Sequence, residues 1–240
     1  MKSIPLALAV LGVLAFRVSA QTAPFNVHIE VQMVSMPLDK GLPLLPNLRD
    51  AGSIESAFSQ IQTMIAAGDA TLIAWPELLT KSGQRAVAED ITEVRYASEF
   101  AQPKRPEPTP GGDKKTAPEY AHPERAGAPV PTAFETRNAG ATLEVEPVVS
   151  PDGKTIDLNL VPQHVRLLEF ASVASGRDAN GHDWKIEQPR FFTAKTTTSL
   201  TVLSGQRVLL AEFRGPEGSD QIEFFILKAD VTPVDGAKKK

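Results

Sequence analysis

The chain has 240 residues, of which 42% are hydrophobic and 22% are charged, and this composition is typical of a folded protein with a substantial core. It contains no cysteine, which excludes disulfide bonds, thiolate nucleophiles and cysteine-ligated zinc. The formal net charge of −4 gives no general attraction for nucleic acid, so we expect no nucleic-acid partner.

Residues 1–20 have the three parts of a secretory signal peptide. Lys2 provides a basic start, residues 4–16 are almost wholly apolar, and residues 18–20 supply small side chains before a cleavage point after Ala20. The alternative is an uncleaved anchor, which Arg17 favours, but the apolar run is short for a membrane span of ~20 residues. We therefore expect an exported protein.

The segment 21–100 predicts a strand, one amphipathic helix and a hairpin. Residues 27–34 alternate apolar and polar side chains, as in a half-buried strand. Prolines then interrupt regular structure before a helix that Ser53 caps and Gly68 ends. The interrupting prolines are Pro37, Pro43 and Pro46, and the apolar stripe of the helix consists of Ile54, Phe58, Ile61 and Ile65.

Two short strands follow the helix, and a turn ends this part of the chain. The strands are expected at residues 70–75 and 77–80. The turn at residues 81–84 contains Gly83, and residues 85–94 are expected to return beside the preceding strand as a hairpin.

Residues 101–131 form a proline-rich insert. They hold eight of the 20 prolines and show no apolar periodicity, which predicts a flexible, solvated segment. The basic pairs in this insert are explained by solvation.

Residues 132–235 predict the second part of the β-domain, followed by a basic tail at residues 236–240. The Asp-Gly pair at 152–153 favours a tight hairpin turn, because both positions tolerate positive φ angles. Residues 176–183 are expected to form a polar loop. The expected strands are residues 141–149, 155–161, 166–173, 191–203, 207–213 and 222–231.

A short motif occurs twice. Ser-Gly-Gln-Arg stands at residues 82–85 and again at residues 204–207, each time between two apolar strands. One interpretation is a pair of similar hairpins, since glycine is common in such turns. The other is two equivalent corners of one β-fold.

Four stretches, taken in this order, resemble the C-terminal domain of the bacterial secretins, the ring-forming outer-membrane channels of type II and type III secretion and of type IV pili. They are residues 27–34, residues 67–84, residues 140–149 with Asp152 and Gly153, and residues 196–208. Residues 222–227 resemble the closing strand of that domain. The resemblance covers most of residues 27–233 apart from the proline-rich insert.

The chain departs from the secretin pattern in two ways. Only residues 214–220 separate the late hairpin from the last strand, where secretins carry a long segment that contributes to the part that meets the outer membrane. We also expect none of the ring domains that precede the core in secretins. The resemblance therefore implies a reduced, secretin-like β-domain of paired hairpins, mainly β with one short amphipathic helix, in the bacterial periplasm or outer membrane.

No motif points to enzyme chemistry. The four histidines form no zinc-binding array, and neither a serine-hydrolase elbow nor a phosphate loop occurs. Asp178, Asn180 and Asp183 faintly resemble a calcium loop, but an ordinary polar turn explains them better. Glu144 and Glu146 share a strand face, where exposed charge is far more common than a catalytic pair. We expect no enzyme activity, no cofactor and no small-molecule substrate.

Strand edges are the expected functional feature, because secretin domains pair strands between neighbouring subunits. The resemblance places this interface on residues 140–149 and 197–203. The residues expected there are Gly140, Leu143, Val145, Leu200, Val202 and Gly205.

Two functional hypotheses follow. The first is a secretin-like envelope protein that works in protein secretion or pilus-type export, by forming homo-oligomers or by docking onto secretion-system proteins, with outer-membrane association possible. The second is a monomeric extracytoplasmic β-module that binds a protein or a glycan. The first predicts a ring of subunits and the second a monomer.

Overall fold

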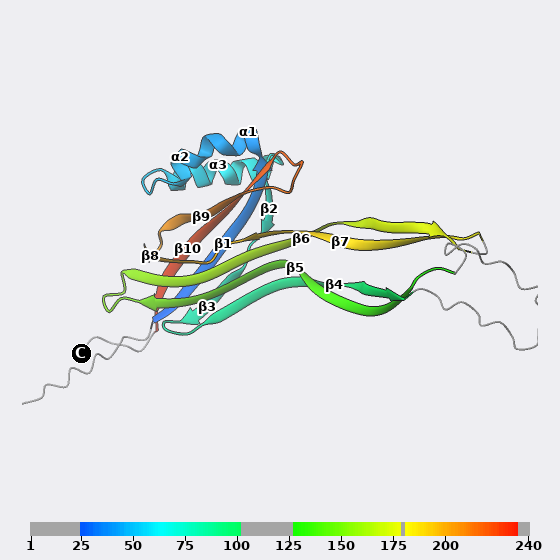
Figure 1. The fold of residues 1–240 in the computed structure, drawn as a ribbon. Coiled ribbons are helices and arrows are strands. Elements are labelled where there is room, and N and C mark those ends of the chain that lie inside the picture. The colour runs from blue at the N-terminus through cyan, green and yellow to red at the C-terminus, as the bar shows by residue number, and fades with distance from the viewer. Residues whose placement is uncertain (1–24, 102–126, 179–180, 235–240) are drawn as a thin grey trace, which may run out of the picture.

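The computed structural model describes residues 25–101, 127–178 and 181–234, and it consists of two stacked antiparallel sheets with a layer of helices over one of them (Figure 1). This confirms a mainly β fold. The expected signal peptide, the basic tail and nearly all of the proline-rich insert lie outside the described residues.

The first sheet, which we call the helix-covered sheet, has the strand order β2-β1-β10-β9, and β3 also pairs with β1. Its strands are β1 (Phe25–Pro37), β2 (Thr71–Ala74), β3 (Glu77–Lys81), β9 (Arg207–Arg214) and β10 (Gln221–Pro233). The second, which we call the long sheet, has the order β4-β5-β6-β7, and β8 also pairs with β6. Its strands are β4 (Ala86–Ala101), β5 (Val130–Val149), β6 (Thr155–Arg177), β7 (Asp183–Lys195) and β8 (Thr198–Leu203).

The main core lies between the two sheets. Alternating side chains of β1 point into it, and so do alternating side chains of β5 and β6, because successive residues of a strand face opposite sides. Each buried side chain of this size contributes about 1.5–3 kcal/mol relative to an exposed one. The largest fully buried members are Ile29, Met33, Leu143, Ile156, Leu158, Leu160 and Phe225.

The helical layer covers the opposite face of the helix-covered sheet and encloses a second core. The amphipathic helix is α3 (Ile54–Ala67), and Gly68 ends it with a φ of 80°, as predicted. Ser53 precedes it, but its hydroxyl donates to the carbonyl of Asn47 at 3.1 Å and caps no helix N–H group, so that detail was wrong. No helix in the described part of the chain is long and apolar enough to cross a membrane.

The prolines between β1 and α3 do not prevent helix formation. Three short elements fill this segment, namely α1 (Leu38–Gly41), η1 (Leu42–Leu44) and α2 (Leu45–Leu48). Pro43 and Pro46 occupy the first turns of η1 and α2, where a missing N–H group costs nothing. The prediction of irregular structure here was therefore wrong.

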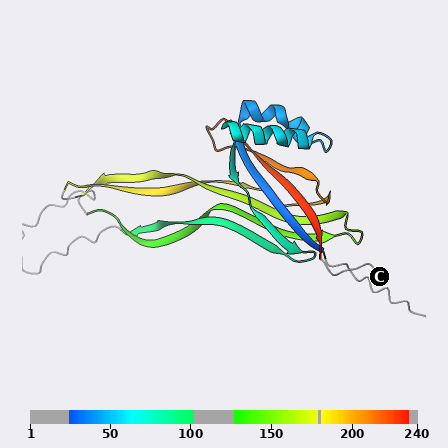
Figure 2. The ribbon, with the colours of Figure 1, turned by 180° about the vertical axis from the view of Figure 1, so that it is seen from behind.

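The long sheet extends beyond the stacked region as two arms, which Figure 2 shows from behind. The β5–β6 ladder ends at the pair Gly140–Val165, and beyond it β4 pairs with β5 as one arm while β6 pairs with β7 as the other. Gly140 lies at this fork with a φ of 128°, and a Cβ atom there would stand 2.1 Å from the carbonyl oxygen of Asp90. Only glycine fits this position.

Neither Ser-Gly-Gln turn closes a hairpin. The first leads from β3 in the helix-covered sheet to β4 in the long sheet, and the second leads from β8 in the long sheet to β9 in the helix-covered sheet. Gly83 and Gly205 both have positive φ, as turns of this kind require. The predicted turns are present, but they are corners between sheets, as the second interpretation held.

Two expected strand boundaries also differ from the structure. The strand predicted at residues 166–173 is part of one long β6, and the strand predicted at residues 191–203 is divided between β7 and β8.

Candidate assembly edges of the long sheet

Strands β4 and β7 form the long outer edges of the long sheet. Among the described strands, β4 pairs only with β5, and β7 pairs only with β6. They contain 16 and 13 residues, which makes them long for edge strands. Each presents a row of backbone N–H and C=O groups that another strand can pair with.

The two edges carry opposite charge. Strand β4 has four carboxylates and one cation, and strand β7 has three cations and two carboxylates. The residues concerned are Glu89, Asp90, Glu93, Arg95 and Glu99 on β4, and Asp183, Lys185, Glu187, Arg190 and Lys195 on β7. Opposite charge favours pairing of a β4 edge with a β7 edge over pairing of like edges.

Strand direction is compatible with the same pairing. The strands from β4 to β7 alternate in direction, since each neighbouring pair is antiparallel. A β7 edge placed beside the β4 edge of another copy therefore runs antiparallel to it, which is the pairing of a continuous antiparallel sheet. Such a head-to-tail contact uses two different edges, and repeating it generates a closed ring when the rotation per subunit closes.

Within one chain the two arms touch through side chains, and both views place β7 beside β4 there (Figures 1 and 2). The amide Nε2 of Gln188 on β7 donates to the carbonyl oxygen of Ala97 on β4 at 2.8 Å. Arg137 lies with its guanidinium 4.6 Å from the Phe191 ring centroid and donates from Nη2 to Thr193 Oγ1 at 3.0 Å. No backbone ladder joins β4 to β7 in the described chain.

Several large apolar side chains are exposed on the arms. Phe134 on β5 is 52% exposed, and its ring packs under the guanidinium of Arg95 at 4.7 Å. Exposed apolar side chains gathered in one region mark surfaces that associate with other molecules. The exposed apolar residues of the arms are Val130, Phe134, Leu168, Phe170 and Val173.

The six residues expected at an interface lie elsewhere. Leu143, Val145 and Val202 are buried between the two sheets of the same chain, and Leu200 packs partly buried against that core. Gly140 lies at the fork and Gly205 at a corner between sheets. The interface expected at these positions remains a prediction. The side chains of Leu143, Val145 and Val202 are, however, buried within the chain and not exposed to a partner. The segregated charge of residues 86–101 and 183–195 is the signal that could have pointed to the edges.

The described members of the predicted ion and acid–base candidates have other partners in the structure. Asn180 lies outside the described residues, while Asp178 Oδ1 accepts from the backbone N–H of His182 at 2.8 Å and Asp183 pairs with Arg177 at 2.8 Å. Glu144 forms an ion pair with Arg85. In the described ranges, no group of three or more histidine, aspartate or glutamate side chains could hold a metal ion.

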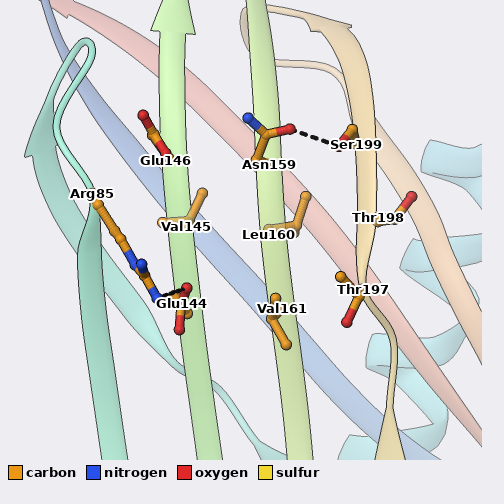
Figure 3. Close-up of a pocket in the computed structure, with 10 residues that line it drawn as sticks. All are labelled: Arg85, Glu144, Val145, Glu146, Asn159, Leu160, Val161, Thr197, Thr198 and Ser199. Carbon is orange, nitrogen blue, oxygen red and sulfur yellow. Dashed lines mark hydrogen bonds and ion pairs between the residues drawn. The ribbon is translucent and has the colours of Figure 1, made fainter.

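A shallow groove of about 130 Å³ lies on the outward face of the long sheet (Figure 3). The Arg85–Glu144 ion pair stands on one side of it, and Ser199 Oγ donates to Asn159 Oδ1 at 2.6 Å on the other. These four polar side chains therefore pair with one another.

A buried ion pair joins the two sheets close to the fork. Arg166 is the first residue of β6 beyond the β5–β6 ladder, and its guanidinium pairs with the fully buried Glu223 of β10. Burial raises the pKa of Glu223, and Arg166 opposes this shift. Burial also lowers the pKa of the neighbouring His164, and the charge of Arg166 adds to this effect. The pair fixes the base of an arm to the helix-covered sheet.

Comparison with known proteins identifies the family. Residues 63–213, more than half of the chain, match the family described as "Secretin: Bacterial type II and III secretion system protein". No curated protein matches the chain.

Three solved structures illustrate the similarity. The Salmonella SPI-1 type III secretion injectisome secretin InvG is 12% identical with a TM-score of 0.42, and the match covers 91% of this chain and 67% of InvG. The secretin GspD in the ETEC pilotin–secretin AspS–GspD complex is 10% identical with a TM-score of 0.44, over 90% of this chain and 50% of that chain. The V. cholerae type IV competence pilus secretin PilQ is 12% identical with a TM-score of 0.40, over 88% and 61%.

At these TM-scores the assignment depends on the sequence match, and this chain spans only part of each structure compared. Secretins are channel proteins of the bacterial envelope, with a role in secretion or pilus function. On the evidence of residues 63–213, the chain belongs to the secretin family.

Proposed function

We propose that copies of this chain assemble head to tail into a ring, in which β4 of one copy pairs with β7 of the next, and that this ring serves protein secretion or pilus-type export across the bacterial envelope. The observation that carries the proposal is the pair of long edges with opposite charge and compatible direction. Residues 1–20 export the chain in this proposal. The proline-rich insert lies between β4 and β5, and the two ends of the expected range 101–131 are part of these strands, since Ala101 pairs with Val130.

Assembly replaces one set of contacts with another. In a single chain the arms touch through Gln188 and Ala97 and through Arg137 and Phe191. In the ring the same edges gain a backbone ladder with neighbouring copies. An interface of two such edges satisfies backbone donors and acceptors that otherwise bind water.

The direct test is the mass of residues 21–240, measured by light scattering after size exclusion with and without mild detergent. A discrete species of many subunits is expected. A monomer in both conditions would overturn the ring and favour the alternative, a monomeric module that binds a protein or glycan. Assembly that appears only with other secretion-system proteins would instead indicate docking.

A charge reversal tests which edges pair. Glu93→Lys on β4 reduces the complementarity of the two edges and is expected to weaken assembly, most strongly at low salt because salt screens exposed charges. Glu217→Lys makes the same change in net charge outside β4 and β7, and is the matched control. Equal loss of assembly in both variants would show that net charge, and not the β4 edge, is responsible.

A further inference from the structure

The ten strands fall into two series of five with the same pairing scheme. In the first series, β1 pairs with β2 and β3, and β4 pairs with β5. In the second series, β6 pairs with β7 and β8, and β9 pairs with β10. The first strand of each series also pairs with the last strand of the other, as β1 with β10 and β6 with β5.

The register agrees residue by residue between the series. When β1 is laid on β6 and β10 on β5, the pair Val27–Val231 coincides with Ile156–Val149. With the same alignment, Val31–Leu227 coincides with Leu160–Val145, and Met33–Phe225 with Pro162–Leu143. The short strands β3 and β8 are aligned in the same way, since the pair Asn26–Lys81 of β1 and β3 coincides with the pair Thr155–Leu203 of β6 and β8. Over the aligned positions the ladders differ by one bulge in the β1–β2 pair and one in the β9–β10 pair, while the further bulges of the β4–β5 and β6–β7 ladders lie in the arms.

The two Ser-Gly-Gln corners make equivalent hydrogen bonds. The N–H of Gly83 donates to the carbonyl of Pro147 at 2.7 Å, and Ser82 Oγ accepts from the N–H of Val149 at 2.9 Å. At the other corner, the N–H of Gly205 donates to Ala229 at 2.8 Å, and Ser204 Oγ accepts from Val231 at 2.9 Å. The acceptors and donors on the last strand of each series occupy the same aligned positions.

We infer that this domain consists of two copies of one five-strand unit, residues 25–149 and 155–233, related by a pseudo-twofold axis that exchanges the two sheets. Two unrelated hairpins with similar turns would share neither the register of three ladders nor the corner hydrogen bonds. The repeated Ser-Gly-Gln-Arg motif is the part of the duplication that is still visible in the sequence.

The two five-strand units differ in the segments that connect their strands and in the lengths of the strands. The first carries the helical layer between β1 and β2, over an outward sheet face that is apolar. At the aligned positions of the long sheet, Ile226 corresponds to Glu144 and Phe224 to Thr142, and this face is open. The second unit has a direct β6–β7 connection in place of the helices, and the long sheet has arms in place of short edges. Helical cover and assembly edges are thus separate specialisations of equivalent sheets.

A circular permutation tests the duplication. In the native chain, residues 150–155 join Val149 to Ile156, and the aligned ends are Val231 and Val27. The permuted chain starts at Ile156, runs to Val231 and continues from Val27 to Val149, so it no longer contains residues 150–155 at their native place. The same six residues, Ser-Pro-Asp-Gly-Lys-Thr, are instead inserted between Val231 and Val27 as the new joint. The control is the same permutation with a Gly-Ser joint of equal length.

The transplanted turn is expected to give a cooperatively folded protein at least as stable as the Gly-Ser control. The reason is that β10 and β1 have the same strand register as β5 and β6, which this turn connects in the native chain. An unfolding constant more than tenfold larger than that of the control would overturn the equivalence of the two joints.

If neither permuted chain folds, two substitutions in the protein with its native chain order test the duplication. Ser82→Ala and Ser204→Ala each remove the same corner hydrogen bond, and each is expected to raise the unfolding constant by on the order of 3- to 10-fold. Losses that differ by more than tenfold between the two variants would overturn the proposal. Neither measurement depends on ring formation, so the duplication and the assembly proposal can fail separately.

Discussion

The two sheets share a pairing scheme, but they bury their faces differently. In the helix-covered sheet the central strand β10 contains a continuous apolar run, and Phe224 and Phe225 on opposite faces are both fully buried. In the long sheet β5 alternates between buried and exposed side chains, with Val145 buried and Val148 exposed. A sheet with both faces covered serves stability, whereas one with an open face and long edges remains available to partners.

The largest expected effect concerns the fork of the long sheet. Gly140→Ala places a Cβ atom 2.1 Å from the Asp90 carbonyl oxygen and imposes a φ of 128° on a residue that has a side chain. We expect a loss of about 3–4 kcal/mol in the free energy of unfolding, measured by urea denaturation. Gly218→Ala is the control, because that position also has positive φ but open space around it, and a loss of about 1 kcal/mol is expected. Equal losses would show that the close approach at the fork is unimportant.

The second effect compares the buried faces directly. Phe224→Ala leaves a cavity beneath the helices and is expected to cost about 3 kcal/mol. Val148→Ala on the open face of the long sheet, where the side chain is 46% exposed, is expected to change stability by less than about 0.5 kcal/mol. Thermal unfolding of both variants measures the contrast, and a large loss for Val148→Ala would indicate that this face is covered in solution.

The third effect compares two arginines at equivalent corners. Arg207 is 9% exposed, pairs with Glu30 at 3.5 Å and Glu55 at 3.4 Å, and lies 3.6 Å from the Phe58 ring centroid of α3. Arg85 is 63% exposed and pairs with Glu144. We expect Arg207→Ala to lose about 2 kcal/mol and Arg85→Ala less than about 1 kcal/mol. Circular dichroism during urea unfolding provides the measurement, and a reversed order would contradict helical cover as the cause of the difference.

The smallest effect is the pH dependence that Glu223 contributes. Because burial raises its pKa above the ordinary 4.5, the folded chain holds this proton more strongly than the unfolded chain. Its contribution to stability is therefore fully present below pH 4.5 and declines as the pH rises through the raised value.

Glu223→Gln is expected to remove that decline. The urea midpoint measured between about pH 4 and pH 7 compares the variant with the unmodified chain. A decline of equal size in both proteins would assign the effect to another group.

Local pattern in the sequence predicted much of the fold. Alternation at residues 27–34 and 141–149 identified β1 and part of β5, the apolar stripe identified α3, and glycines identified the turns. The short helices between β1 and α3 were missed because proline was interpreted as a breaker, although it fits the first turn of a helix. The secretin resemblance placed the expected interface on strands whose side chains Leu143, Val145 and Val202 are buried within the chain, because a resemblance between sequences does not show which face of a strand is covered by the chain itself.

By itself the sequence determined the family, the β-rich character that the strand patterns predict, and the positions of the two Ser-Gly-Gln corners. These depend on neighbouring residues, whose spacing sets the local backbone and the side of a strand that is apolar. Only the tertiary structure decided which strands pair, that both corners cross between sheets, and that β4 and β7 remain as edges. Strands that pair can lie far apart in the sequence, as β1 and β10 do at a separation of some 200 residues. A local pattern of residues shows which side of a strand is apolar, but it does not show with which other strand it pairs.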